Sequence, residues 1–333
     1  MDIKNLLISL TKTHSAGHID HSLQKALDIL EPVSKVTVYD QFITAETNIN
    51  CSTSLMLEAH IDQVAMIVTA VYDNGFLRVS PVGSIDARLL PATRVKVYGK
   101  EVLSGVFGSV PPHLKKDDAA FDFDSLYIDT GVLGLEKIVS KGDLAFFDTE
   151  PTSLLNDNFC AAGLDNKAGA TAVISAFLEI ASQNLPIHTT LCLTFGEELG
   201  LRGGTVAAFN GDYDLAISVD VSFGECEGVA PHKTAKLGSG AMVGISPILN
   251  REISNTLKDI CEKENIPYTL EVMGGRTGTN ADVISISKGG IKTGLVSIPL
   301  KNMHSPVEIV NLKDISAVSK LLTLFAKEVS KND

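Results

Sequence analysis

Apolar residues follow a helical period in some stretches of the chain and a strand pattern in others, and this divides the sequence into three parts. Residues 3–10 and 19–31 carry apolar side chains at helical spacing, whereas residues 35–39 and 54–59 are short apolar runs typical of strands. From residue 164 onward, helical and strand patterns alternate again. Because such alternation builds a sheet covered by helices, the outer parts are predicted to form one mixed-sheet α/β domain flanked by helices.

The middle part, residues 64–153, shows short strand patterns and no long helical period. A turn sequence, Asp73-Asn74-Gly75, separates two of these patterns and is typical of a β-hairpin. Further strand patterns follow at residues 94–98, 102–107, 125–128 and 143–147. Short strands at this density are typical of a small barrel or sandwich. We therefore expect a discontinuous α/β domain of residues 1–66 and 154–333, interrupted by a small β-barrel-like domain of residues 67–153.

Composition places the chain among globular proteins with a large core. Of its 333 residues, 44% are hydrophobic and 20% are charged, and the formal net charge is −12. This charge argues against nucleic acid and anionic membranes as partners, and it is compatible with a site that binds cations. The five cysteines are scattered without a Cys-x-x-Cys pair, which favours reduced thiols. Because no secretory signal is apparent, we expect a cytoplasmic protein.

Imidazole and carboxylate side chains follow four of the predicted strands. They are His60, the adjacent pair Glu197 and Glu198, Asp220 and His304, and a further carboxylate, Asp165, lies at the start of a predicted helix. Taken singly, each has an ordinary explanation, such as a buried histidine, a helix N-cap or a turn residue. Ligands of α/β sheets bind where strand ends meet, so the combination predicts one site. Imidazole and carboxylate without thiolate is the ligand set of a hydrolytic Zn²⁺, Co²⁺ or Mn²⁺ site.

The segments around these residues resemble the M42 family of metallo-aminopeptidases, which contains the glutamyl aminopeptidases and the tetrahedral TET peptidases. The matching segments are Ala59-His-Ile-Asp-Gln-Val64, Gly163-Leu-Asp-Asn-Lys-Ala-Gly169, Gly196-Glu-Glu-Leu-Gly-Leu-Arg-Gly203, Ile217-Ser-Val-Asp220 and Ser297-Ile-Pro-Leu-Lys-Asn-Met-His-Ser-Pro-Val-Glu308. Pro111-Pro-His113 and Tyr127-Ile-Asp-Thr-Gly131 resemble motifs of the family's inserted domain. The resemblance covers nearly the whole chain, and its motifs are specific in combination.

The resemblance implies a site with two divalent ions per subunit, Zn²⁺ or Co²⁺, roughly 3.5–4 Å apart as in other two-metal sites. The resemblance implies that His60 and Asp220 bind one ion, that Glu198 and His304 bind the other, and that Asp165 bridges both. It also implies that Asp62 orients His60 and that Glu197 is the general base. A cis peptide bond between Asp165 and Asn166 is also implied. The partners implied are peptide substrates and further copies of the chain, joined through the inserted domain, with a dodecamer as one candidate assembly.

The sequence departs from the family pattern at a few positions near the motifs. Gln63 and Ala65 stand where the family often has Glu and Gly, Lys301-Asn302 replaces the usual Arg-Tyr, and Asn280 replaces an expected Asp. None of these changes removes a predicted ligand or the predicted base, but they bear on substrate preference. Three basic residues are either substrate contacts or solvated charges: Arg276, Lys301 and Lys236.

Three functions fit these residues. The first is an aminopeptidase that removes N-terminal residues from peptides, and the second is a metal-dependent deacylase or other amide hydrolase on the same scaffold. The third is a non-catalytic metal-binding regulatory protein, against which the complete set of predicted ligands argues. A glycanase is disfavoured, because that chemistry uses two flanking carboxylates and no histidine-bound metal.

Overall fold

The structure, a computed structural model, describes residues 2–16, 23–48, 50–109, 113 and 122–332. Its main sheet contains β1 (Lys35–Val38), β2 (Phe42–Thr47), β3 (Ser54–His60), β10 (Thr152–Ser153), β11 (Asn158–Ala161), β12 (His188–Thr194), β13 (Leu215–Phe223), β14 (Ala241–Ile245), β15 (Tyr268–Val272), β16 (Lys292–Lys301) and β17 (Glu308–Asn311). The strand order is β1-β2-β12-β3-β13-β16-β17-β11-β10, and β14 joins β15 to β16. The four central strands β12, β3, β13 and β16 are parallel, so their carboxyl ends lie at one edge.

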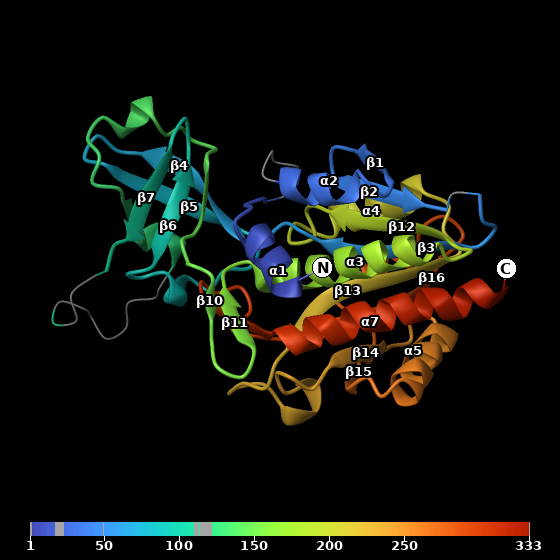
Figure 1. Ribbon diagram of the computed structural model, residues 1–333. Helices are drawn as coiled ribbons and strands as arrows, with labels where there is room; N and C mark the ends of the chain where they lie inside the picture. The colour runs from blue at the N-terminus through green and yellow to red at the C-terminus, as the bar shows by residue number, and fades with distance from the viewer. Residues whose placement is uncertain (1, 17–22, 49, 110–112, 114–121, 333) are drawn as a thin grey trace.

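Helices cover both faces of this sheet (Figure 1). They are α1 (Ile3–Thr11), α2 (Gln24–Leu30), α3 (Leu164–Gln183), α4 (Arg202–Asn210), α5 (Arg251–Lys263), α6 (Ala281–Ile284) and α7 (Leu312–Val329). Helices α3, α5 and α7 pack on one face, and α4 and α6 on the other. Alternate residues of β3 divide between the faces, since Leu55 and Leu57 belong to the core under α3 whereas Met56 packs with Ala207 of α4. Burial on both faces explains the continuous apolar runs of the central strands.

Six strands of the middle part close into a separate barrel, drawn at the left of Figure 1. They are β4 (Ala65–Val71), β5 (Phe76–Val82), β6 (Arg94–Tyr98), β7 (Val102–Phe107), β8 (Ile128–Asp129) and β9 (Leu144–Phe147), in the order β4-β5-β8-β7-β6-β9. Gly75, with a φ of +86°, takes the left-handed conformation in the turn between β4 and β5. The barrel has its own core, which includes Val68, Leu77 and Val95.

The predicted fold class is confirmed, because a mixed sheet flanked by helices and a closed barrel are both present. One predicted strand is wrong: residues 123–125 form a 3₁₀ turn, and only Ile128 and Asp129 pair as a strand. The Asp122 carboxylate accepts a 2.9 Å hydrogen bond from the Ser125 backbone N–H and so stabilises the turn. Residues 19–22 of a predicted helix, and Pro111 and Pro112, lie outside the described residues. No helix in the described part of the chain is long and apolar enough to cross a membrane.

Candidate active site

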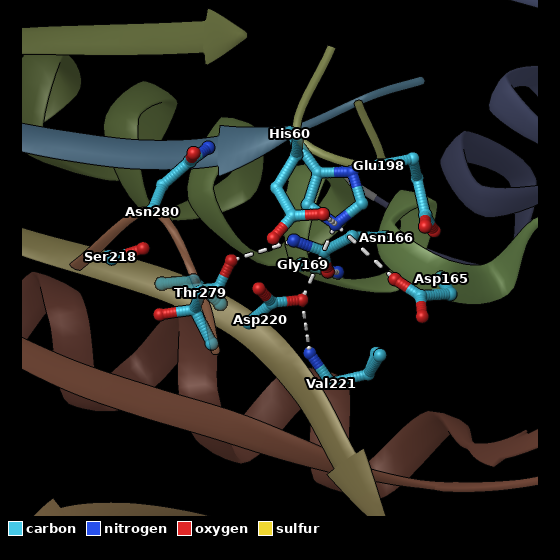
Figure 2. A network of polar contacts seen from close by, with 12 residues as sticks. His60, Asp165, Asn166, Gly169, Glu198, Ser218, Asp220, Val221, Thr279 and Asn280 are labelled. Atoms are coloured by element: carbon cyan, nitrogen blue, oxygen red, sulfur yellow. Dashed lines mark hydrogen bonds and ion pairs between the residues drawn. The ribbon is translucent and has the colours of Figure 1, made fainter. Parts of the chain in front are cut away.

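The predicted ligands gather at the edge where the parallel strands end. His60 is the last residue of β3, the Glu197-Glu198 pair follows β12, and His304 follows β16. Asp220 differs from its prediction in one respect, because β13 continues to Phe223 and Asp220 therefore lies inside the strand. A hydrogen bond of 2.8 Å from the Val221 backbone N–H holds its carboxylate (Figure 2).

Asp165 lies between the two histidines. Its Oδ1 is 3.3 Å from His60 Nε2, and its Oδ2 is 3.3 Å from His304 Nε2. Around His60, the Asp220 Oδ1 atom lies 3.5 Å and the Glu197 Oε2 atom 4.0 Å from Nε2. Figure 2 shows His60 beside both Asp165 and Asp220.

The second histidine has its own carboxylate partner. Glu198 Oε1 lies 3.1 Å from His304 Nε2. The donor atoms therefore form two groups, His60–Asp220–Glu197 and His304–Glu198–Asp165, and within each group they lie within 4.8 Å of one another.

Both histidines present the same ring nitrogen to the carboxylates. His60 Nδ1 lies 3.2 Å from the backbone carbonyl oxygen of Asp62, and His304 Nδ1 lies 2.8 Å from that of Ser84. A carbonyl oxygen accepts a hydrogen bond, so in the neutral ring Nδ1 carries the proton and Nε2 keeps a free lone pair. Metal-binding histidines are usually held in this way. The donor set therefore fits divalent ions, because it offers two imidazole nitrogens and four carboxylates without a thiolate.

Burial and mutual repulsion shift the protonation of these carboxylates. Burial, with the nearby charges of Asp220 and Asp165, raises the pKa of Glu197 to about 9. Burial also raises the pKa of Asp220 to about 6. Burial opposes the charge on His304, but hydrogen bonds to Asp165 and Glu198 outweigh it and raise its pKa to about 11. The cluster thus binds positive charge strongly, as carboxylates crowded in one cleft must.

The Asp62 carboxylate contacts the glutamate pair as well as His60. Its Oδ1 lies 3.5 Å from His60 Nδ1, which is farther than the Asp62 carbonyl oxygen is. Its two oxygens accept hydrogen bonds from the backbone N–H groups of Glu197, at 3.3 Å, and Glu198, at 3.4 Å. Asp62 therefore holds the turn after β12 in place relative to the end of β3.

Glu308 has a similar role that the sequence analysis did not assign. Its buried carboxylate accepts a 3.1 Å hydrogen bond from the Asp165 backbone N–H and a 2.8 Å hydrogen bond from the His304 backbone N–H. It thereby joins two predicted ligands that are far apart in the sequence. Its position inside the last matching motif was the only signal in the sequence.

The backbone turns at the start of α3, where Asp165 and Asn166 have non-helical conformations. The peptide bond between them is cis, as the family resemblance implies. Asn166 Nδ2 donates to the Val219 carbonyl oxygen at 2.7 Å, and the Gly169 N–H donates to Asn166 Oδ1 at 3.0 Å. These contacts fix Asn166 between α3 and β13.

A buried carboxylate lies behind His60. Glu58 Oε1 accepts 2.7 Å hydrogen bonds from Thr194 Oγ1 and Asn280 Nδ2, and its Oε2 accepts one of 2.7 Å from Ser218 Oγ. Burial raises the pKa of Glu58. Asn280, one of the departures from the family pattern, therefore acts as a donor to a buried acid that lies two residues before His60.

Gln63, another departure, is the partner of a buried lysine. Lys167 Nζ donates to Gln63 Oε1 and, at 2.7 Å, to the Thr13 carbonyl oxygen. Burial lowers the pKa of Lys167 to about 7, although Glu308 and Asp62 oppose this shift. The side chain at position 63 thus stabilises the interior beside the site without facing a ligand atom.

The site opens into a cavity of about 460 Å³. Leu201, Phe223, Glu271 and Met303 are among its lining residues, together with the predicted ligands. Of the three basic residues considered from sequence, only Arg276 lines this cavity.

Replacing Glu308 by Gln should weaken divalent-metal binding by about 10- to 100-fold, the usual cost of losing a partner that orients metal ligands. The amide keeps one acceptor oxygen, so one of the two backbone N–H groups of Asp165 and His304 loses its partner. Isothermal titration with Zn²⁺ or Co²⁺ measures the change, and Glu252→Gln on the exposed start of α5 is the matched control. Unchanged affinity in Glu308→Gln would contradict this role.

Comparisons with known proteins agree with the motifs. Residues 42–321 match the M42 glutamyl aminopeptidase family. A lysyl aminopeptidase of Pyrococcus furiosus is 28% identical over 317 residues, which cover 92% of this chain and 91% of that protein.

An aminopeptidase of Desulfurococcus kamchatkensis superposes with a TM-score of 0.88 at 28% identity, covering 98% of this chain and 94% of that one. The TET1 peptidase of Pyrococcus horikoshii superposes with a TM-score of 0.86 at 27% identity, covering 98% of this chain and 100% of that one. The chain therefore belongs to the M42 glutamyl aminopeptidase family and is a metal-dependent aminopeptidase, as its motifs predict.

Proposed function

We propose that the chain hydrolyses the first peptide bond of its substrates with two divalent ions bound at this site. The observation that carries the proposal is the position of Asp165, whose two oxygens each lie 3.3 Å from a different histidine. His60 and Asp220 would hold one ion, His304 and Glu198 the other, and Asp165 both. Nitrogen and oxygen donors without thiolate support Zn²⁺ or Co²⁺.

When bound, such an ion pair lowers the pKa of a water molecule and polarises the scissile carbonyl group. The remaining work falls to side chains of the chain itself. Glu197 lines the cavity, and its Oε2 atom lies 4.0 Å from His60 Nε2, so its carboxylate is placed to take a proton from water and then pass it to the leaving amine. Glu198 belongs to the His304 group instead, at 3.1 Å from Nε2. Because the two carboxylates lie beside different histidines, one glutamate can bind metal while the other acts as the base.

Substituting the two glutamates singly should separate these roles. Glu197→Gln cannot accept a proton, so kcat should fall by about 10²- to 10⁴-fold while metal content stays normal. Glu198→Gln loses a ligand, so its activity should recover in part when Zn²⁺ or Co²⁺ is added in excess. Activity and bound metal are measured across a metal titration. The opposite pattern would exchange the two roles, and near-normal activity in both variants would remove this pair from the catalytic centre.

Acetylation of the substrate's N-terminus should abolish turnover. An aminopeptidase requires a free α-amine, whereas a deacylase or an endopeptidase does not. Rates on matched free and N-acetylated peptides, followed by mass spectrometry, measure the difference. Equal cleavage of both would favour the deacylase, and no cleavage of either by metal-loaded protein would favour a non-catalytic role.

We also propose that residues 67–153 act as a separate domain that mediates self-association, inserted into a catalytic domain of residues 1–66 and 154–333. The barrel has its own core and exposes apolar side chains, among them Tyr72, Val102 and Leu133, the last 80% exposed. The related TET1 peptidase of Pyrococcus horikoshii can assemble into a tetrahedron or a large octahedral shell.

Net charge −12 and the absence of disulfides among the five cysteines support a cytoplasmic enzyme that acts on peptides rather than nucleic acid or membranes.

The purified chain should therefore form a closed homo-oligomer, for which twelve subunits is the candidate number. Light scattering coupled to size-exclusion chromatography at micromolar concentration measures its mass. Charged substitutions at Val102 and Leu133 should reduce the assembly, whereas a charged substitution at exposed Ile286, on the α/β part, serves as the control. A monomeric wild type would contradict the proposal.

A further inference from the structure

Two carboxylates that line the cavity, Glu271 and Asp282, belong neither to the metal-binding groups nor to the contacts that position them. Glu271, on β15, lines the cavity and accepts hydrogen bonds from the hydroxyl groups of two buried serines, Ser222 and, at 2.7 Å, Ser297. Among the described residues, no lysine or arginine nitrogen lies within 4.0 Å of it. Burial raises the pKa of its carboxyl group, the direction expected when no cation stabilises the charge.

Strand register places this carboxylate beside the catalytic centre. Ser297 on β16 is the register partner of Asp220 on β13, and Ser222 lies two residues beyond Asp220 on the same face. The register partner of Glu271 on the intervening strand β14 is Gly244, and the Glu271 carboxylate reaches across β14 to Ser297 on β16. Two residues along a strand span about 6.6 Å, a distance that the four-carbon stem of a lysine can cover.

The other charged groups of the cavity are less suited to contact the substrate's side chain. Asp282 accepts hydrogen bonds from the Thr277 N–H and hydroxyl group, at 2.8 and 2.7 Å, and from the Gly278 N–H at 3.2 Å, so it is committed to its own loop. Arg276 is exposed and does not pair with Glu271.

Apolar side chains line the same cavity as Glu271. Leu201, Phe223 and Met303 are among them, and they provide the surface on which a long aliphatic stem packs while its charged end reaches a partner. An apolar wall together with a carboxylate that lacks a cation is complementary to a lysine or arginine side chain.

We propose that Glu271 is a specificity residue that binds the side-chain cation of the substrate's N-terminal residue, so that the enzyme prefers peptides beginning with lysine or arginine. This inference rests on the proposed aminopeptidase function. The preference is argued from Glu271 and its surroundings in this chain, and not from the description of the family, which is that of a glutamyl aminopeptidase.

The test compares kcat/KM for p-nitroanilides of lysine, arginine, norleucine and glutamate, since norleucine has the stem of lysine without its charge. Wild type should prefer lysine over norleucine by at least about 30-fold, the cost of leaving one member of a buried charge pair alone. Glu271→Gln should remove most of this preference and leave norleucine turnover within about twofold. Glu252→Gln, whose side chain is 83% exposed, is the charge-matched control and should behave as wild type.

Each other outcome has a defined meaning. A wild-type preference for norleucine or glutamate overturns the proposal, and a glutamate preference would point to Arg276. An equal loss on all substrates in Glu271→Gln also overturns it, because Glu271 would then bind the α-ammonium or only support the fold. If the variant does not fold, the inhibition constants of free lysine and free norleucine are measured on wild type instead. Lysine is expected to bind more tightly, and equal or tighter binding of norleucine overturns the proposal. No turnover of any substrate by metal-loaded wild type would instead refute the aminopeptidase function itself.

Discussion

The crowding of carboxylates around two histidines is the constraint on which the structure of this site depends. Four acidic side chains lie within reach of His60 and His304, and the oxygens of Asp165 face both rings at 3.3 Å. Burial removes the water that would otherwise screen their repulsion, and this is why the pKa values of Glu197 and Asp220 rise. Such a cluster is stable only with protons or cations in it, so the fold that assembles it also creates a strong requirement for positive charge.

Two further acids hold this arrangement together through the backbone. Asp62 accepts hydrogen bonds from the N–H groups of both glutamates after β12, and Glu308 accepts them from Asp165 and His304. Each carboxylate thus joins two segments, which keeps the ligand side chains from moving independently. Buried hydrogen bonds of this kind contribute more to stability than the exposed ion pairs elsewhere on the molecule, such as Arg88 with Asp86, which water screens.

The sequence was informative wherever a local pattern determines the structure. The predicted ligands could be found because parallel strands end at one edge, so residues after apolar runs such as His60 and His304 had to converge. Glu308, Glu58 and Glu271 could not be assigned in this way, because their partners come from distant segments and depend on strand register. The strand expected at residues 125–128 failed for a local reason, since the Asp122 side chain caps a turn there.

The barrel is connected to the chemistry as well as to the chain. The loop after β5 supplies the Ser84 carbonyl oxygen that contacts the ring of His304, and a Cβ atom at neighbouring Gly83 would lie 2.9 Å from Val64 and 3.4 Å from Glu198. Both residues lie in the segment proposed as the assembly domain, and Ser84 contacts a member of the group His304–Glu198–Asp165. The position of the barrel relative to the sheet therefore affects the orientation of the His304 ring.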